Sequence, residues 1–378
     1  MSAHILPNAM LGILGGGQLG RMFTMSARAM GYRVSVLDPD AESPAGGLAD
    51  VHLRAAYDDS EALCTLTQTC AAVTTEFENV PAESMRYLEK HVRVSPSAES
   101  VAIAQDRIRE KRYISGVGLK VAPFLAIEAE ADLGQNLGDH LPGILKIARL
   151  GYDGKGQFRV KTAQTAQDAF ASVGGKPCVL ERMLNLKTEI SVIVTRTGPG
   201  EAVCFPVAEN QHESGILDIS IVPARVDEAI AERARQMAVH LAEAMDYVGV
   251  LAVEFFVLED GELLINEIAP RPHNSGHFTL DATLFSQFDQ QVRAMCGLPP
   301  GDTRLLSPVV MVNLLGDIWR DDEPAWDKLL SQPNVHLHLY GKKSARIGRK
   351  MGHFNVLAED VEIALAQALE LKRMLREP

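Results

Sequence analysis

Residues 253–278 read VEFFVLEDGELLINEIAPRPHNSGHF, and this stretch predicts a β-hairpin that places two acidic side chains opposite each other. Asp260-Gly261 is typical of a two-residue type I′ turn, because both central residues of that turn need a positive φ. Counted outward from such a turn, the facing pairs are Glu259 with Glu262, Phe256 with Ile265 and Glu254 with Glu267. Facing side chains on antiparallel strands lie about 4.5–5.5 Å apart, so like charges repel there. We therefore expect a cation between Glu254 and Glu267.

The composition of the two strands favours a metal ion as that cation. Around the two glutamates the strands are mostly aliphatic or aromatic, and an unpaired carboxylate in such surroundings is costly. Mg²⁺ binds carboxylate oxygens and usually keeps water and phosphate in the rest of its coordination shell. Glu254 and Glu267 are therefore candidate metal ligands of a magnesium-nucleotide site. The alternative is a solvated acidic hairpin.

The segment directly after the hairpin, APRPHNSGH at residues 269–277, has the composition of a reaction centre. Prolines before and after Arg271 restrict its backbone. A guanidinium fixed beside a metal-phosphate site can bind a planar oxyanion through two parallel hydrogen bonds. We expect this segment to be rigid and non-helical.

Length and composition indicate an ordinary globular protein of two or three domains, with 378 residues, 46% hydrophobic and 23% charged. The sequence shows no run of about 18 apolar residues and no signal-peptide pattern, so we expect a cytoplasmic protein with no membrane partner. The five cysteines are scattered without a C-x-x-C, which favours core thiols over disulfides or a zinc site. A net charge of −12 argues against nucleic-acid binding, so an anionic substrate needs a local basic cluster.

Residues 11–20, LGILGGGQLG, predict a strand, a glycine-rich turn and the start of a helix. Gly15, Gly17 and Gly20 satisfy G-x-G-x-x-G, and Asp38 lies near the spacing of a ribose-binding acid, so a nicotinamide oxidoreductase is one alternative. The same turn can present backbone N–H groups to any phosphate. Polar side chains at the mouth of the loop and the lack of a second dinucleotide-binding half disfavour the oxidoreductase.

Alternating short strands and helices continue and predict a parallel α/β domain of about a hundred residues. EFENVP at residues 76–81 follows a strand, where open α/β sheets present ligand-binding groups. Glu76 is the better candidate of the two acids, whereas Glu78 and Asn79 are expected to cap the helix that begins near Pro81. Residues 97–115 predict one charged helix, mostly solvated, with one basic residue turned inward.

Beyond residue 144 the pattern changes to strands with a glycine-rich segment. A strand at residues 144–148 carries Lys146, and RLGYDGKG at residues 149–156 supplies three glycines. We expect this segment to close over phosphates as a lid, with Lys146 as a point charge; the alternative is a flexible turn. Glu181 ends one later strand and Glu189 begins the next, positions that suit a ribose hydroxyl pair or solvent.

Helices are expected at residues 163–173, from Asp227 to about residue 245, and at residues 280–296 and 361–375.

The last part of the chain contains the basic cluster that the net charge requires. YGKKSARIGRKMGH at residues 340–353 holds five cations between residues 342 and 350. Its glycines allow tight turns, so a site for a phosphate-bearing substrate is a better interpretation than a solvated loop.

Six motifs occur in one order: GGGQLGRM, EFENVP, GYDGKGQ, NQHESGIL, the hairpin with INEIAPRPHNSGHF, and GRKMGH. With them the chain resembles the 5-(carboxyamino)imidazole ribonucleotide synthases of the ATP-grasp superfamily, over nearly its whole length. The resemblance implies an α/β and α+β ATP-grasp fold. It implies a pre-grasp α/β domain at residues 1–115, a two-lobed ATP-grasp domain at residues 116–300 and a small C-terminal domain at residues 301–378. Superfamily habit also suggests a homodimer.

The implied reaction carboxylates the exocyclic amine of 5-aminoimidazole ribonucleotide with ATP and bicarbonate, in purine biosynthesis. Bicarbonate attacks the γ-phosphorus, and the resulting carboxyphosphate is kept from water under a closing lid. The nearest alternative is the formate-using ATP-grasp phosphoribosylglycinamide transformylase, which resembles this chain in the PRPH segment. Asn274-Ser275-Gly276-His277 and GRKMGH favour the carboxylase. A non-catalytic nucleotide-binding regulator is a more distant alternative.

The resemblance also implies a role for each residue that matches a family motif. The metal ligands would be Glu254 and Glu267. ATP would be bound by Arg107, Lys146, Tyr152, Asp153, Gly154, Lys155, Gly156, Gln157, Glu181, Glu189, His212 and Asn266. The ribonucleotide would be bound by Gln18, Leu19, Glu76, Tyr152, Lys342, Arg349 and Lys350. Catalysis would involve Arg271, His273, Asn274, Lys146 and His212. Ala269 stands where many superfamily members have a metal-binding asparagine, so no third protein ligand is assigned.

Overall fold

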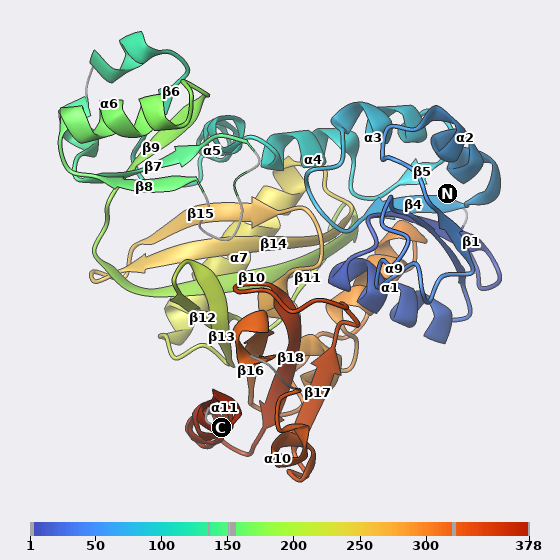
Figure 1. The fold of residues 1–378 in the computed structure, drawn as a ribbon. Coiled ribbons are helices and arrows are strands. Elements are labelled where there is room, and N and C mark those ends of the chain that lie inside the picture. The colour runs from blue at the N-terminus through green and yellow to red at the C-terminus, as the bar shows by residue number, and fades with distance from the viewer. Residues whose placement is uncertain (1–3, 135–136, 150, 152–155, 320–322, 377–378) are drawn as a thin grey trace.

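The computed structural model describes residues 4–134, 137–149, 151, 156–319 and 323–376. Their strands form three sheets: a five-stranded sheet in the N-terminal part, a four-stranded sheet in the middle and a nine-stranded sheet in the remainder (Figure 1). The first sheet is parallel and the other two are antiparallel. This combination confirms the expected α/β and α+β fold class.

The N-terminal sheet is a parallel α/β unit whose central strand is fully buried. In spatial order its strands are β3 (Val51–Leu53), β2 (Arg33–Leu37), β1 (Met10–Leu14), β4 (Ala72–Thr75) and β5 (Arg93–Val94). Helices α1 (Gln18–Ala29), α2 (Ser60–Thr69) and α3 (Ala82–Glu89) connect them. Every residue of β1 is buried, as expected at the centre of a parallel sheet. The strand order reverses between β1 and β4, so the loops that follow these two strands meet at one edge.

The four-stranded sheet forms a small lobe at one end of the molecule (Figure 1). In order its strands are β6 (Phe124–Ile127), β9 (Cys178–Arg182), β7 (Gly143–Ile147) and β8 (Gln157–Val160). One face packs against α6 (Ala163–Ser172) and the 3₁₀ helices η1 (Glu130–Gly134) and η2 (Leu137–His140). Lys146 and Glu181 therefore lie on neighbouring strands of one small sheet.

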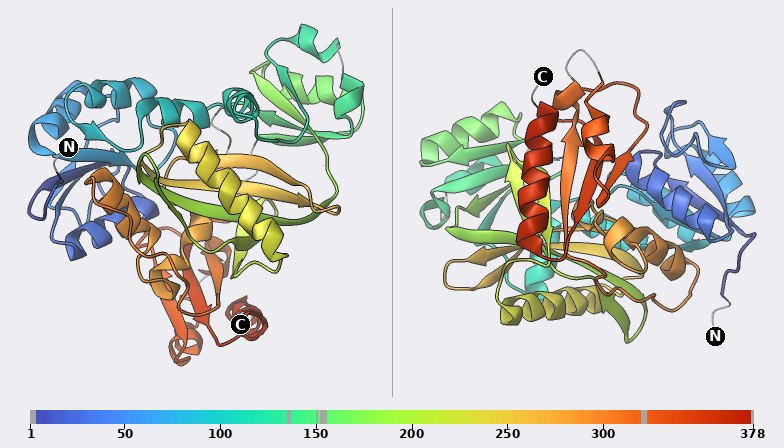
Figure 2. Two further views of the ribbon diagram at one scale, coloured as in Figure 1. Left: turned by 180° about the vertical axis from the view of Figure 1, so that it is seen from behind. Right: turned by 90° about the horizontal axis from the view of Figure 1, so that it is seen from below.

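The nine-stranded sheet runs without interruption into the C-terminal part of the chain. Its order is β15 (Leu263–Ala269), β14 (Gly249–Leu258), β10 (Leu186–Gly198), β12 (Ala208–Glu213), β13 (Ile216–Val222), β16 (Val309–Leu315), β18 (Lys350–Leu357) and β17 (Val335–Leu339), with β11 (Glu201–Cys204) on β10. Helix α7 (Glu228–Ala244) covers β10 and β14, and α11 (Val361–Arg376) covers β16 and β18 (Figure 2). The expected domain boundary near residue 301 thus divides one continuous sheet, and it stays a prediction.

The hairpin of β14 and β15 confirms that Glu254 faces Glu267, but the predicted type I′ turn is wrong. Gly261 has a φ of +80°, whereas Asp260 is not among the residues with positive φ. Leu258 N donates to the carbonyl of Glu262 at 2.9 Å, so the loop contains three residues rather than two. A three-residue loop needs a left-handed conformation only at its glycine, which spares the aspartate that strain.

The longer loop shifts the register next to it by one residue. Phe255, not Phe256, faces Ile265, and Glu259 does not face Glu262. A bulge that leaves Asn266 without a facing partner then restores the count before the two glutamates are reached. Such a bulge lets two consecutive side chains oppose one residue of the other strand.

Two predicted helices are each broken in the structure by a capping residue. Residues 97–115 form α4 (Ala98–Ala104) and α5 (Arg107–Gly116), because Asp106 accepts hydrogen bonds from the backbone N–H groups of Ile108 and Arg109. Residues 280–296 form α8 (Thr279–Ala282) and α9 (Gln287–Met295), and Ser286 forms a capping box with Asp289. The remaining short elements are η3 (Asn274–Gly276), η4 (Gly316–Trp319) and α10 (Trp326–Leu330). The segment after the hairpin therefore contains one 3₁₀ turn.

A column of aromatic rings joins that segment to the C-terminal strands. The His353 ring stacks on His338 with 4.6 Å between centroids and lies 4.8 Å from the His277 ring. Tyr340 Oη is 2.9 Å from His353 Nδ1, and Asp281 Oδ2 is 2.8 Å from His338 Nε2. Burial lowers the pKa of both His277 and His353 well below the ordinary value, so both are neutral at pH 7.

In the described part of the chain, no helix is both long and apolar enough to cross a membrane. All five cysteines are free thiols. Cys70, Cys178 and Cys296 are buried, as predicted for core thiols, whereas Cys64 and Cys204 are only partly buried.

The break before α5 can be tested at its cap. Asp106→Ala removes the side chain that binds two backbone N–H groups, so the free energy of unfolding in urea should fall by about 0.5–2 kcal/mol. Asp106→Asn keeps the capping oxygen and should stay close to wild type. A single helix through residues 97–115 would give the opposite sign for Asp106→Ala, because alanine is the better helix former.

The buried histidines predict a loss of stability in acid. An unfolded histidine titrates near pH 6.5, whereas His277 and His353 remain neutral in the folded chain below that pH. The unfolded state therefore binds more protons, and the stability lost as pH falls below about 6.5 should approach about 1.4 kcal/mol per pH unit for each residue. His353→Phe keeps a ring and removes one of these groups, so its unfolding free energy should fall less between pH 7 and pH 5. Identical pH dependence in the two proteins would contradict this.

Candidate active site

The carboxylates of Glu254 and Glu267 face each other at the bulge of the β14–β15 hairpin. Burial and the charge of Glu267 raise the pKa of Glu254. For Glu267, burial acts upward too, but the Arg107 guanidinium outweighs it and holds the pKa below its usual range. The pair therefore titrates unevenly, as carboxylates that share one site do. A cation between them would allow both to ionise.

Two side chains hold this pair from outside the hairpin. Arg107 Nη1 donates to Glu267 Oε2 at 2.6 Å, so Arg107 is one basic residue of the predicted charged helix that turns inward. His273 Nε2 lies 3.2 Å from Glu254 Oε1. The backbone N–H of Ser275 donates to His273 Nδ1, which assigns the ring proton to Nε2 and makes that nitrogen a donor to Glu254. Burial and a neighbouring guanidinium lower the pKa of His273 to about 3, so the ring is neutral.

The residues around this pair fit a divalent cation. Asn266 Oδ1 is buried without a hydrogen-bond partner, and Asn266 is the bulge residue beside Glu267. A buried, unpartnered amide oxygen on the residue next to Glu267 is, like the two carboxylates, an oxygen ligand of the kind that Mg²⁺ prefers. Among the described residues, no group of three or more His, Cys, Asp or Glu side chains could hold a metal ion. The ligand set offered here is thus two carboxylates and one amide oxygen.

Lys146 and Glu181 bring charge to this hairpin from the small sheet. Lys146 Nζ donates to Glu181 Oε2 at 3.1 Å, and both residues are buried. Lys111 of α5 reaches Glu181 Oε1 at 3.3 Å. Burial raises the pKa of Glu181, but the ammonium groups of Lys146 and Lys111 more than offset this and hold it low. Lys111 is fully buried as well, so two basic residues of the predicted charged helix turn inward where one was expected.

A contact between an imidazole and a carboxylate lies on the large sheet, between β10 and β12. His212 Nδ1 is 3.4 Å from Glu189 Oε2, and Glu189 faces Asn210 across the two strands. Burial raises the pKa of Glu189, while His212 and Lys146 act in the opposite direction. Glu189 and His212 therefore lie together, as expected for two residues assigned to one nucleotide site.

Part of the predicted lid lies outside the described residues, namely Tyr152, Asp153, Gly154 and Lys155. Gly156 has a φ of +74°, and Gln157 is the first residue of β8, directly opposite Lys146 on β7. The glycine-rich segment thus ends beside Lys146, the predicted phosphate-binding lysine.

The glycine-rich turn after β1 is closed by carboxylates. Glu76, which follows β4, accepts hydrogen bonds from the backbone N–H groups of Gly17 and Gly20 at the start of α1. Asp38 Oδ2 accepts from Gly16 N at 2.7 Å and from the Tyr57 hydroxyl. Asp38 is therefore engaged within the protein, which weakens its reading as a ribose-binding acid and with it the oxidoreductase alternative.

The C-terminal basic cluster lies next to this turn. Lys342 Nζ donates to the carbonyl of Lys350 at 2.7 Å, and Lys343 forms an ion pair with Glu42. The charge of Lys342 lowers the pKa of Glu76, although burial raises it overall. Lys350 acts likewise on Glu254. The cluster therefore lies between the N-terminal turn and the β14–β15 hairpin. Gln18 and Leu19 are the first residues of α1, directly after that turn.

Arg349 uses its guanidinium locally, donating to Ser344 O and Oγ at 2.7 and 2.8 Å. Its predicted contact with the ribonucleotide would require it to exchange these exposed bonds for a ligand.

Arg271 forms an ion pair with Glu78, which was expected to cap a helix. Its Nε donates to Glu78 Oε2 at 2.7 Å, and both side chains are largely buried. Helix α3 begins after Pro81 without a side-chain cap, so the prediction that Glu78 caps it is wrong. Burial raises the pKa of Glu78, but the Arg271 charge outweighs it and keeps the carboxylate ionised.

Asn274 is paired with another amide rather than pointing at an open site. Its Nδ2 donates to Asn313 Oδ1 at 3.0 Å, and Asn313 Nδ2 donates back at 2.8 Å. Asn313 on β16 also donates to the carbonyl of Leu217. Asn274 therefore anchors the segment after the hairpin to the large sheet, a function that a single chain position could not reveal.

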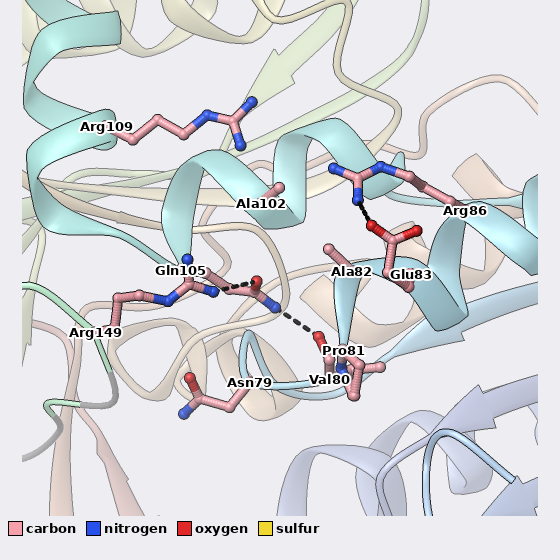
Figure 3. Close-up of a pocket in the computed structure, with 10 residues that line it drawn as sticks. All are labelled: Asn79, Val80, Pro81, Ala82, Glu83, Arg86, Ala102, Gln105, Arg109 and Arg149. Atoms are coloured by element: carbon pink, nitrogen blue, oxygen red, sulfur yellow. Dashed lines mark hydrogen bonds and ion pairs between the residues drawn. The ribbon is translucent and has the colours of Figure 1, made fainter.

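A pocket of about 410 Å³ is lined by residues of α3, α4 and α5, by the segment before α3 and by Arg149 (Figure 3). Gln105 crosses its floor and donates to the carbonyls of Glu78 and Val80. Its lining residues are Asn79, Val80, Pro81, Ala82, Glu83, Arg86, Ala102, Gln105, Arg109 and Arg149. All three of its arginines have an acidic partner: Arg86 pairs with Glu83, Arg109 with Glu99 and Arg149 with Asp106.

Three family models match consecutive parts of the chain. A ribonucleotide synthetase preATP-grasp domain matches residues 9–105, an ATP-grasp domain matches residues 112–288, and a phosphoribosylaminoimidazole carboxylase C-terminal domain matches residues 309–367.

Relatives of known name match over almost the full length. N5-carboxyaminoimidazole ribonucleotide synthase of Bacillus subtilis is 46% identical over 363 residues, which cover 95% of this chain and 94% of the relative. The protein of the same name from Brucella melitensis is 46% identical and covers 92% and 96%.

Solved structures agree. An ADP complex of N5-carboxyaminoimidazole ribonucleotide synthetase has a TM-score of 0.92 at 43% identity, covering 98% of both chains. The Aspergillus clavatus synthase in complex with ADP and 5-aminoimidazole ribonucleotide has a TM-score of 0.89 at 32% identity, covering 98% and 99%. The chain therefore belongs to the N5-carboxyaminoimidazole ribonucleotide synthase family of ATP-grasp proteins.

Proposed function

We propose that this chain uses ATP and bicarbonate to carboxylate the exocyclic amine of 5-aminoimidazole ribonucleotide. As a member of its family it is an ATP-dependent ligase of purine biosynthesis. The observation that carries the proposal for its own site is the pair Glu254 and Glu267, faced on one hairpin and flanked by Arg107 and His273.

The nucleotide would lie between the small sheet and the hairpin of the large sheet. Lys146 would bind its phosphates, Glu181 and Glu189 would contact the adenine and ribose, and His212 would orient Glu189, to which it is already paired. Glu254, Glu267 and the unpartnered Oδ1 of Asn266 would hold Mg²⁺. When bound there, the metal would neutralise phosphate charge and align the terminal phosphate.

Bicarbonate would be bound by Arg271 beside the terminal phosphate. Glu78 accepts from Nε of Arg271 and the carbonyl of Pro272 accepts from Nη1, so the oxyanion would bind at the remaining N–H groups of the guanidinium. The bicarbonate oxygen would attack the γ-phosphorus, the bond to ADP would break, and carboxyphosphate would form. The neutral His273 would keep its proton on Nε2 and donate it in a hydrogen bond to Glu254. It would therefore not act as a base toward bicarbonate.

The ribonucleotide would lie at the N-terminal turn, near Gln18, Leu19 and Glu76. Lys342 and Lys350 would bind its phosphate, because the charge of Lys342 acts on Glu76 and that of Lys350 on Glu254, and Arg349 would join them from the position next to Lys350. Its amine could then attack the carboxyl carbon and release phosphate. A homodimeric state and a cytoplasmic location remain predictions.

The proposed reaction can be tested with ¹⁸O-labelled bicarbonate. Transfer through carboxyphosphate places one bicarbonate oxygen in the released phosphate, in the presence of ATP and the ribonucleotide. Unlabelled phosphate would overturn this route. Phosphate release with formate in place of bicarbonate would instead favour the formate-using transformylase.

The metal assignment predicts a severe effect of Glu267→Gln. The neutral amide removes a hard anionic ligand, so ATP cleavage should fall by about a hundredfold or more while the circular dichroism spectrum stays unchanged. Glu259→Gln changes a glutamate in the loop of the same hairpin and should leave the rate near wild type. Full ATPase activity in Glu267→Gln would rule out the assignment.

The basic cluster predicts a change in KM rather than in ATP cleavage. Arg349→Ala removes a charge-assisted phosphate contact, so the KM for 5-aminoimidazole ribonucleotide should rise by about tenfold to a hundredfold. Arg346→Ala in the same loop serves as the matched control and should change it little. If titration finds normal ribonucleotide binding but weakened ATP binding in Arg349→Ala, Arg349 belongs to the nucleotide site.

A further inference from the structure

Helix α5 lies between the two sheets that would hold the nucleotide (Figure 1). It contacts β9 of the small sheet on one side and β15 of the large sheet on the other. Three of its side chains hold three consecutive residues of β15. Arg107 Nη1 donates to Glu267 Oε2 at 2.6 Å, and Lys111 Nζ donates to the carbonyl of Asn266 at 3.2 Å. Glu110 Oε1 accepts from the backbone N–H of Ile268 at 2.5 Å.

The side chain of Lys111 contacts both sheets. Besides the carbonyl of Asn266 on β15, its Nζ reaches Glu181 Oε1 on β9 at 3.3 Å. The other oxygen of Glu181 accepts from Lys146 at 3.1 Å. A chain of contacts therefore runs from the predicted phosphate-binding lysine, through Glu181 and Lys111, to the main chain beside the metal carboxylate.

The burial of Lys111 carries an unfavourable free energy of desolvation. Its side chain has 0% exposure, and that of Glu181 has 4%. Removing an ammonium from water costs several kcal/mol unless it is paired well, and apolar replacements of buried ion pairs are often neutral or stabilising. Stability alone is thus a weak reason for an ammonium here, whereas the precise placement of two sheets is a strong one.

We propose that Lys111 is a positioning residue that couples nucleotide binding on the small sheet to metal binding on the large sheet. The inference rests on the proposed function only in taking Glu254 and Glu267 as the metal site and Lys146 and Glu181 as part of the nucleotide site. Lys111 fixes Glu181 and the Asn266 main chain relative to each other. Phosphates bound at Lys146 are thereby held where a metal between the two glutamates can reach them.

The coupling can be measured without turnover, by titration calorimetry of ADP binding with and without Mg²⁺. In wild type, Mg²⁺ should strengthen ADP binding. Lys111→Met replaces the ammonium with an apolar chain of similar length, so this strengthening should shrink by about tenfold, with ADP alone affected much less. Arg112→Met is the matched control: it removes the next cation of α5, an exposed one paired with Glu128, and should preserve the strengthening.

Steady-state kinetics give a second readout. In Lys111→Met the kcat for ATP cleavage should fall by about tenfold or more, while the KM for 5-aminoimidazole ribonucleotide should change less than about twofold, because the ribonucleotide is proposed to lie at the N-terminal sheet. A purely structural role would lower the melting temperature but leave the Mg²⁺ effect on ADP intact, and that result would overturn the proposal.

The two failures are distinguishable. A wild-type protein that couples Mg²⁺ to ADP but does not carboxylate the ribonucleotide would refute the proposed reaction and leave the coupling testable. If Lys111→Met does not fold, Lys111→Gln takes its place; the shorter amide cannot span Glu181 and Asn266 together, and an undiminished Mg²⁺ effect in it would equally overturn the proposal.

Discussion

The structure depends on two carboxylates being brought face to face at one point of an antiparallel hairpin. Glu254 and Glu267 would repel each other there without further support. Arg107 offsets one charge from α5, and His273 donates to the other from the segment after the hairpin. What remains is a pair of buried carboxylates whose protonation is uneven, and a cation between them would allow both to ionise.

The three sheets can be understood by what each adds to this point. The small sheet contributes Lys146 and Glu181, which reach the hairpin through Lys111 of α5. The N-terminal sheet contributes the turn closed by Glu76, and also Glu78, which holds Arg271. The large sheet carries the hairpin itself and extends into the strands that support the basic cluster. Helix α9 packs against α1 as well as β10 and β14, so the first and third sheets share one interface.

Much of this could be predicted from the sequence because the signals were local. The apolar run of β1, the glycines after it and the amphipathic stripe of α7 depend on nearby residues only. The hairpin is more instructive. Its loop is one residue longer than predicted, yet Glu254 faces Glu267 because the bulge at Asn266 restores the register. Asp-Gly fits both a two-residue and a three-residue loop, so the turn alone does not set the register.

What the sequence did not reveal depends on contacts between distant segments. Residues 97–115 carry seven charged positions, and only the packing of α5 on β15 determines that Arg107 and Lys111 turn inward. Glu78 reads as a cap because Pro81 follows, and its partner Arg271 is 193 positions away. The helix breaks at Asp106 and Ser286 did have a local signal, since aspartate and serine at these positions are strong N-caps.

The central claim is that Glu254 and Glu267 jointly bind one divalent cation at the nucleotide site. The most direct measurement replaces Mg²⁺ with Mn²⁺ and follows its electron paramagnetic resonance during titration of the wild-type protein with and without ADP. The account predicts one Mn²⁺ bound per chain, tightened by ADP, with the spectrum of nucleotide-bound Mn²⁺ showing coupling to the ADP phosphorus nuclei. Binding of Mn²⁺ that ADP neither strengthens nor perturbs would contradict it.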